Sequence, residues 1–153
     1  MNAIVIYDSK FGNTERIAKA IGYALADELN VRVQSVDETA ALPRELELLV
    51  IGGPSHAHGM SIPMRTFLQG MPNDALRAVP ALVFDTRFRM SKIISGTAAA
   101  KIARVLRRNG AKVLLPPESF FVSRSEGHPL EPGEQERATA WARDVIAFLA
   151  HAA

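Results

Sequence analysis

Short, densely apolar runs alternate along this chain with longer stretches in which apolar residues recur every three or four positions. Three runs, at residues 3–7, 46–51 and 80–85, are apolar at nearly every position, which predicts strands buried on both faces. A looser alternation of apolar and polar residues at 31–36 predicts a strand nearer the sheet edge. This pattern is typical of a parallel sheet covered by helices on both faces.

The stretches with helical periodicity predict four helices. The first begins at Gly12 or Asn13, and its apolar stripe consists of Ile17, Ile21, Leu25 and Leu29. The others cover residues 62–70, 97–108 and 134–149, and the first two of these end at glycine. Between the second and third strands we expect only a short turn.

The fifth strand is predicted to be split. The prolines at 116–117 cannot donate hydrogen bonds to a strand ladder, so the two pieces are expected at 113–115 and 119–122, at a sheet edge. Residues 123–133 are polar and rich in turn residues, which predicts a loop. The expected fold is a single α/β domain over residues 1–153, with a doubly wound, five-stranded parallel sheet and helices on both faces.

Composition narrows the class of protein. The chain has 153 residues and no cysteine, which excludes disulfides, thiolate metal sites and a cysteine nucleophile. Its N-terminus lacks the basic start and apolar core of a secretory signal, and no apolar run approaches the roughly 20 residues that span a bilayer. We therefore expect a cytoplasmic protein without a membrane span.

The charge is mildly basic. The formal net charge is +2, and basic residues are interleaved with acidic ones, so nucleic acid is not an expected partner. One local concentration is formed by Lys101, Arg104, Arg107, Arg108 and Lys112. At helical spacing this cluster is interpreted first as a solvated helix face and second as a docking patch.

The segment between the first strand and the first helix has the chemistry of a phosphate site. It reads Ser9, Lys10, Phe11, Gly12, Asn13 and Thr14. Two hydroxyls, a glycine that permits close backbone approach and a helix N-terminus are what a phosphate requires. The segment matches neither the G-x-G-x-x-G nor the G-x-x-x-x-G-K-[ST] phosphate loop. The alternative is that these residues only cap the helix.

The segment IVIYDSKFGNT resembles the first strand and phosphate loop of the flavodoxin family. The resemblance continues through VIGGPSHAHG and VFDTR and so extends over the whole chain, most closely to short flavodoxin-domain proteins. It implies the strand order 2-1-3-4-5 and an FMN cofactor bound at the carboxyl ends of the strands.

The resemblance also implies two loops that hold the flavin ring. One face is assigned to Pro54, Ser55, His56, Ala57, His58 and Gly59, and the other edge to Asp85, Thr86, Arg87 and Phe88, followed by Arg89. Many flavodoxins stack the ring between Trp and Tyr, but the first of these loops has neither. His56 or His58 is the candidate substitute, and Phe88 either stacks on the ring or packs beneath its loop. Two histidines without an acidic or thiol neighbour make a poor metal site, and none is expected.

The leading functional interpretation is an FMN-binding redox protein that shuttles electrons to a partner protein, either a flavin reductase or an electron acceptor. One alternative is an FMN-dependent oxidoreductase, such as a quinone reductase or a relative that oxidises protoporphyrinogen. The other is an interaction module that keeps the fold without flavin. No catalytic residue is assigned.

The ring loops predict an unusual redox potential. They carry His56, His58, Arg87 and Arg89 against a single acid, Asp85, whereas flavodoxins are usually acidic around the flavin. Positive groups stabilise a developing anion. We therefore expect a less negative potential for the second one-electron reduction than in acidic flavodoxins.

Overall fold

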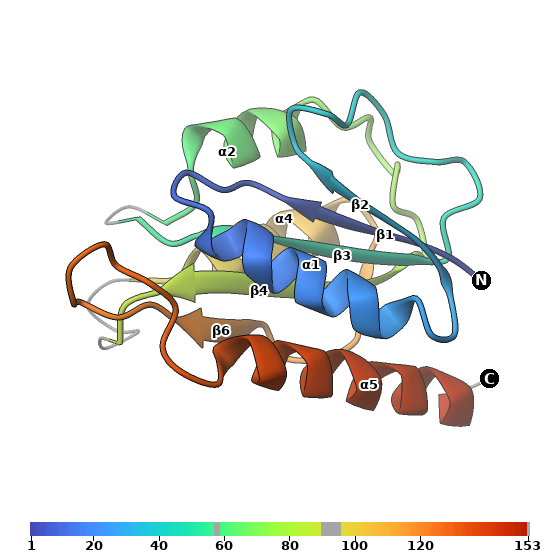
Figure 1. Ribbon diagram of the computed structural model, residues 1–153. Coiled ribbons are helices and arrows are strands. Elements are labelled where there is room, and N and C mark those ends of the chain that lie inside the picture. Colours follow the sequence, from blue (N-terminus) through green and yellow to red (C-terminus); the bar gives the residue numbers. More distant parts are fainter. Residues whose placement is uncertain (57–58, 90–95, 153) are drawn as a thin grey trace.

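The computed structural model describes residues 1–56, 59–89 and 96–152 (Figure 1). Within them, one parallel sheet forms the middle layer. Its strands are β1 (Asn2–Tyr7), β2 (Asn30–Ser35), β3 (Leu48–Pro54), β4 (Pro80–Arg87), β5 (Lys112–Val113) and β6 (Glu118–Phe121). Their order is β2-β1-β3-β4-β5, with β6 also pairing with β4. The doubly wound parallel sheet and its 2-1-3-4-5 order are confirmed.

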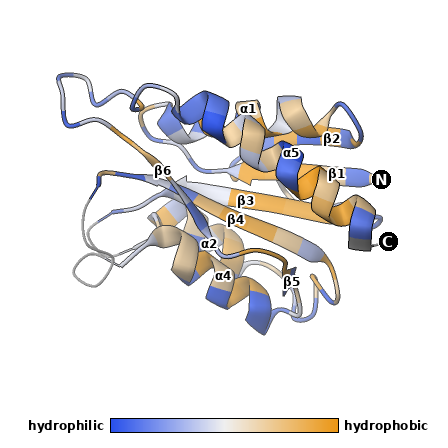
Figure 2. Ribbon diagram, turned by 90° about the horizontal axis from the view of Figure 1, so that it is seen from below, coloured by the Kyte–Doolittle hydropathy of each residue, from blue (hydrophilic) through white to orange (hydrophobic). Residues whose placement is uncertain are grey.

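Helices cover both faces of the sheet, as predicted. The helices α1 (Asn13–Leu25) and α5 (Glu134–Ala152) pack side by side on one face. The helices α2 (Ile62–Gln69) and α4 (Ala98–Arg108) lie on the other face. Figure 2 shows the apolar central strands enclosed between these two helical layers.

Successive residues of the central strands point into two separate apolar cores. In β1, Ala3, Val5 and Tyr7 belong to the core beneath α1 and α5. Ile4 and Ile6 belong to the core beneath α2 and α4. The strands β3 and β4 alternate in the same way. Because both faces of these strands are buried, their polar groups gather where the strands end.

The fifth strand is split as predicted. The short β5 pairs with the start of β4, and β6 pairs with its end, from Phe84 to Arg87. This second pairing extends β4 two residues beyond the predicted end at position 85. Thr86 and Arg87, which were expected in a loop, are therefore buried strand residues.

Other boundaries also differ from the prediction. Pro54 lies at the end of β3 rather than in a loop, because it pairs with Thr86 of β4. The first helix ends at Leu25 instead of reaching Leu29. The amide of Leu29 donates to the carbonyl of Leu25 (2.9 Å), and this closing turn still packs Leu29 against the core that the predicted stripe would have reached.

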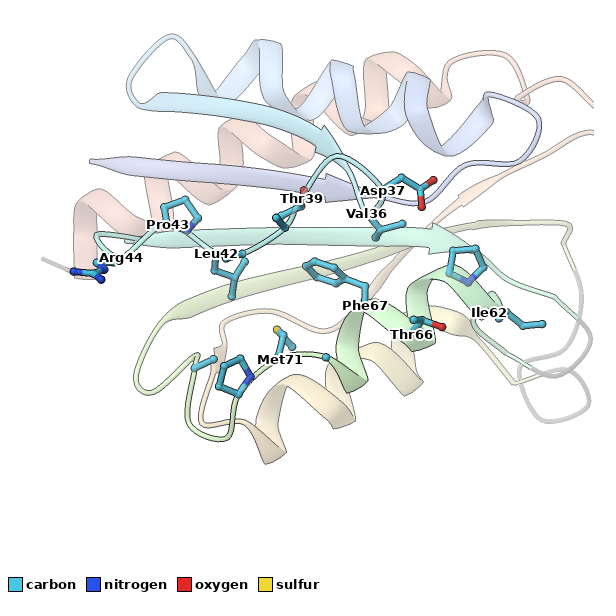
Figure 3. A pocket seen from close by; sticks show the side chains of 16 residues that line it. Val36, Asp37, Thr39, Leu42, Pro43, Arg44, Ile62, Thr66, Phe67 and Met71 are labelled. Atoms are coloured by element: carbon cyan, nitrogen blue, oxygen red, sulfur yellow. The ribbon is translucent and has the colours of Figure 1, made fainter.

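The crossover from β2 to β3, residues 36–47, contains turns and no helix. A hollow of about 900 Å³ lies between this crossover and α2, with Phe67 and Met71 on its helical side and Leu42 and Pro43 opposite (Figure 3). No helix in the described part of the chain is long and apolar enough to cross a membrane.

Two adjacent glycines in β3 give a matched test of core packing. A Cβ at Gly52 would lie 2.5 Å from the ring of Phe84, whereas one at Gly53 would meet the Cε atom of Met64 at 3.5 Å, an ordinary contact. We expect Gly52→Ala to lower the free energy of unfolding by about 1–3 kcal/mol through overpacking. Gly53→Ala should be neutral or slightly stabilising. Urea unfolding measures both, and equal effects would contradict this packing.

Candidate functional site

The carboxyl ends of β1, β3 and β4 meet at one edge of the sheet. A buried hydrogen bond there joins the start of α1, which follows β1, to the end of β4. The hydroxyl of Thr14, in the first turn of α1, lies 2.7 Å from the hydroxyl of Thr86 in β4. Both side chains are almost fully buried. The predicted phosphate segment is therefore fixed to β4, the strand that carries the predicted ring-binding residues from Asp85 onwards.

The N-terminus of α1 differs from those of α2 and α4. Ser61 and Thr97 cap α2 and α4 by accepting from the amides of Met64 and Ala100. The residue at this position before α1 is Gly12, which has no side chain to act as a cap and has the left-handed φ of 93°. The first amides of an α-helix have no partner within the helix, so the start of α1 presents donors to a ligand.

Ser9 shapes the turn before α1. Its Oγ accepts hydrogen bonds from the amides of Gly12 (3.1 Å) and Glu15 (3.3 Å). The amides of Asn13 and Thr14 lie between these two in sequence, where a helix start leaves them without an intrahelical partner. The turn is thus held open at the place where an anion would sit.

A cation that the sequence analysis missed lies beside this turn. A Cβ placed on Gly12 would be 3.8 Å from Nη1 of Arg16, and that nitrogen donates to Oδ1 of Asn13 (3.2 Å). Arg16 follows Gly12 by four residues, one helical turn, so helical spacing alone could have identified it. Together with Lys10 it adds positive charge where a phosphate would bring negative charge.

The loop that joins β6 to α5 contacts the phosphate segment, which the sequence analysis also missed. The buried Asn13 donates through Nδ2 to the carbonyl of His128 (2.7 Å). The ring of His128 lies edge-on to Phe88, with 5.3 Å between centroids, and the guanidinium of Arg124 lies 4.5 Å from the Phe88 centroid. Phe88 is therefore packed against this loop. No sequence signal links position 128 to positions 13 and 88.

Backbone hydrogen bonds join the described residues on either side of the second predicted loop. His56 and Gly59 exchange two backbone hydrogen bonds of 2.8 and 3.0 Å, and Gly59 has a φ of 100°. His56 is exposed, and Ala57 and His58 lie outside the described residues. Ser55 is turned inward, because its Oγ accepts from the amide of Ala98 at the start of α4 (2.8 Å).

Asp85 ties this loop to β4 and α4. Its Oδ2 accepts from the hydroxyl of Ser55 (2.9 Å) and from the amide of Ala99 (3.1 Å). Among the described residues its Oδ1 has no hydrogen-bond partner, and Nε of Arg87 lies 3.9 Å away. Burial raises the pKa of Asp85, and the hydrogen bonds and Arg87 only partly oppose this. Asp85 thus connects the loop after β3, through Ser55, and the start of α4, through Ala99, to the end of β4.

The basic character of the ring loops is weaker than the residue count suggested. Arg89 forms two hydrogen bonds of 3.0 Å with the carboxylate of Glu131, so its charge is paired. Arg87 is buried, lies near Asp85 and donates to the hydroxyl of Ser119 (3.0 Å). The pairing with Glu131 was not visible in the sequence, because it joins segments 42 residues apart.

The hollow of about 900 Å³ beside α2 lies apart from the predicted site, because none of the described residues predicted to bind the cofactor lines it (Figure 3). In the part of the chain that the structure describes, no three His, Asp or Glu side chains gather into a group that could hold a metal ion.

The buried carboxylate gives a pH-dependence that can be measured. The folded state raises the pKa of Asp85, so it binds the proton more tightly than the unfolded chain, whose Asp pKa is about 3.9. The stability of the wild type should therefore fall relative to that of Asp85→Asn as the pH rises from about 4 through the raised pKa. Chemical unfolding across this range tests it. The same trend in Asp144→Asn, an exposed aspartate on α5, would contradict the assignment to Asp85.

Comparison with known proteins places this geometry among solved structures. No family model matches the chain, and no curated protein matches its sequence. An oxidised flavodoxin from Bacillus cereus superposes with a TM-score of 0.79 at 18% identity, covering 96% of this chain and 98% of that one. A flavodoxin from the domain Archaea gives 0.74 at 22% identity, with 95% and 96% covered.

A short-chain flavodoxin associated with a bacterial microcompartment gives a TM-score of 0.76 at 15% identity, with 97% of this chain and 98% of that chain covered. The similarity thus extends over nearly the full length of each protein. This chain has the flavodoxin-like fold in its short form.

Proposed function

We propose that this protein binds FMN at the carboxyl ends of its strands and acts as an electron-transfer shuttle. The observation that carries the proposal is the start of α1. There a left-handed Gly12, the hydroxyls of Ser9 and Thr14 and the guanidinium of Arg16 lie around the start of α1, whose Asn13 and Thr14 amides have no partner within the helix. This donor set suits a phosphate dianion.

At the strand-end edge, one group of residues suits the phosphate of FMN and another suits its ring. The segment from Ser9 to Thr14 would hold the phosphate. The ring would lie between the loop that begins at Pro54 and the end of β4, from Asp85 to Phe88. Bound FMN would supply one- and two-electron chemistry, while the protein binds the cofactor and sets its electrostatic surroundings. The solved flavodoxins that share this fold support the choice of a flavin.

An FMN-dependent oxidoreductase is the alternative among flavin proteins. An enzyme acting on a quinone or a porphyrinogen needs a substrate pocket over the ring. Steady-state reduction of quinone by NAD(P)H with the purified protein would favour the enzyme instead.

The interaction module without flavin is a separate alternative. Its support is that the described ring-loop residues contain no Trp or Tyr. Tyr7 is a strand residue, and Trp141 packs edge-on to Phe120 beneath α5. The start of α1 opposes this alternative, because the amides of Asn13 and Thr14 lie beside two hydroxyls and a guanidinium, and this donor set suits a phosphate.

Comparing FMN with riboflavin isolates the phosphate. Riboflavin lacks the phosphate, so wild-type protein should bind FMN at least 100-fold more tightly. Ser9→Ala and Thr14→Val each remove a hydroxyl, and a hydrogen bond to a charged group contributes about 1.5–3 kcal/mol, or about ten- to 100-fold in Kd. We expect both variants to weaken the binding of FMN by at least tenfold and the binding of riboflavin by less than threefold. Quenching of flavin fluorescence measures both ligands.

Thr139→Val serves as the control, because this hydroxyl bonds only within α5, to the carbonyl of Gln135. It should leave both affinities unchanged. Equal weakening of FMN and riboflavin by Thr14→Val would mean that the loop does not hold the phosphate. No quenching by micromolar wild-type protein would exclude the flavin function.

The redox potential tests the charges near the ring. We expect the second one-electron reduction of the FMN-loaded protein to occur at a less negative potential than in acidic flavodoxins. Glu131→Gln removes the carboxylate that pairs with Arg89 and should raise this potential further. Glu126→Gln, in the same loop but exposed, is the matched control and should have a smaller effect. Potentiometric titration decides, and an unchanged potential in Glu131→Gln would contradict the role of Arg89.

A further inference from the structure

The exposed face of α4 carries basic side chains and no acidic ones. The side chains on this face, called here the basic stripe, are Lys101, Arg104, Arg107 and Arg108. They recur at spacings of three, four and seven residues, opposite the apolar residues that α4 buries against the sheet. The helix sequence AAAKIARVLRR contains no acid at all.

The helix itself does not explain the whole stripe. Cations in the last turn complement the helix dipole, which accounts for Arg107 and Arg108. Arg104 lies in the middle of the helix, and Lys101 lies near the positive end of the dipole, so neither gains from it. Like charges three and four residues apart also destabilise a helix by a few tenths of a kcal/mol per pair. The stripe therefore weakens α4 when the protein is alone.

The charges of the stripe arginines are not paired with acidic side chains in the described part of the chain. Arg104, Arg107 and Arg108 form no ion pair with any residue in the described ranges. They line a hollow of about 520 Å³ together with Ala100 and Pro117. The charge is thus available to a ligand from outside, and the surface around it is indented.

The stripe begins at the proposed flavin site. A Cβ at Gly59 would lie 2.5 Å from Cδ of Lys101, so this side chain rests on the second predicted loop. The start of α4 is bonded to Ser55 and Asp85. An 11-residue helix is about 16 Å long, so a protein that covers the stripe also reaches the strand-end edge.

We propose that the basic stripe is the docking surface for an acidic electron-transfer protein, which it orients towards the strand-end edge. The inference rests on the proposed shuttle function and names the chemistry of its partner. Complementary charge mainly accelerates and orients encounter, which suits a short-lived redox complex. A nucleic acid is disfavoured, because the stripe and its hollow contain no aromatic side chain on which a base could stack.

A charge-reversal experiment tests this surface. The first variant is Arg104→Glu, Arg107→Glu and Arg108→Glu combined. The matched control combines Arg32→Glu, Arg65→Glu and Arg143→Glu, three exposed arginines on β2, α2 and α5, and so makes the same change in net charge. The probe is a plant-type [2Fe–2S] ferredoxin, an acidic electron-transfer protein. Binding is measured by calorimetry at low and high salt, with and without FMN.

We expect the wild type to bind ferredoxin at low salt and to lose most of the affinity as salt rises. The stripe variant should bind at least tenfold more weakly, and the control less than threefold. Equal weakening in both variants would overturn the proposal, because net charge alone would then explain it. Absence of wild-type binding, or tighter binding to a single-stranded oligonucleotide, would also overturn it.

The same samples separate the two proposals. If the wild type quenches FMN fluorescence but ferredoxin binding does not depend on the stripe, the docking surface is wrong and the flavin function stands. If ferredoxin binds through the stripe while FMN does not bind, the flavin function is wrong, and the surface is a docking site that serves no shuttle. Circular dichroism and thermal unfolding confirm that both variants fold.

Discussion

The two-sided burial of β1, β3 and β4 is the constraint on which the rest of this structure depends. Alternate residues of each strand fill separate cores beneath α1 and α5 and beneath α2 and α4. A strand buried on both faces has no place for an unpaired polar side chain along its length. Polar chemistry is therefore displaced to the strand ends, where the chain leaves the sheet and donors from helix starts become available.

Two buried polar contacts hold this edge together. The hydroxyl pair of Thr14 and Thr86 joins the start of α1 to β4, and the carboxylate of Asp85 joins β4 to Ser55 and to the start of α4. The two helix starts are used differently. The first amides of α4 donate to Ser55, Asp85 and Thr97, whereas at the start of α1 the amides of Asn13 and Thr14 are proposed to bind a phosphate. This difference explains why the proposed phosphate site lies at one helix start and the docking surface along the other helix.

Much of the fold follows from local pattern, because buried strands and amphipathic helices have distinct apolar periodicities. The split strand at residues 116–117 and the turn-rich crossover were predicted in this way, whereas the strand order was implied by the resemblance to flavodoxins. The phosphate segment was also predicted locally, since its donors lie within six consecutive residues. The ends of β3 and β4 were misplaced, because a strand ends where its neighbours stop pairing. The sequence of β4 alone gives no sign that β6 extends the ladder to Arg87.

The sequence by itself determined the strands of the sheet and its helical layers, and it predicted a phosphate site at the start of α1, because each depends on residues close together in the chain. Only the tertiary structure decided which charges in the predicted ring loops are paired, as with Arg89 and Glu131, and which loop packs on Phe88 and Asn13. It also decided that the basic face of α4 begins at the strand-end edge, where the flavin is proposed to bind. These are contacts between distant segments, and their energies depend on burial and distance, which appear only once the chain is folded.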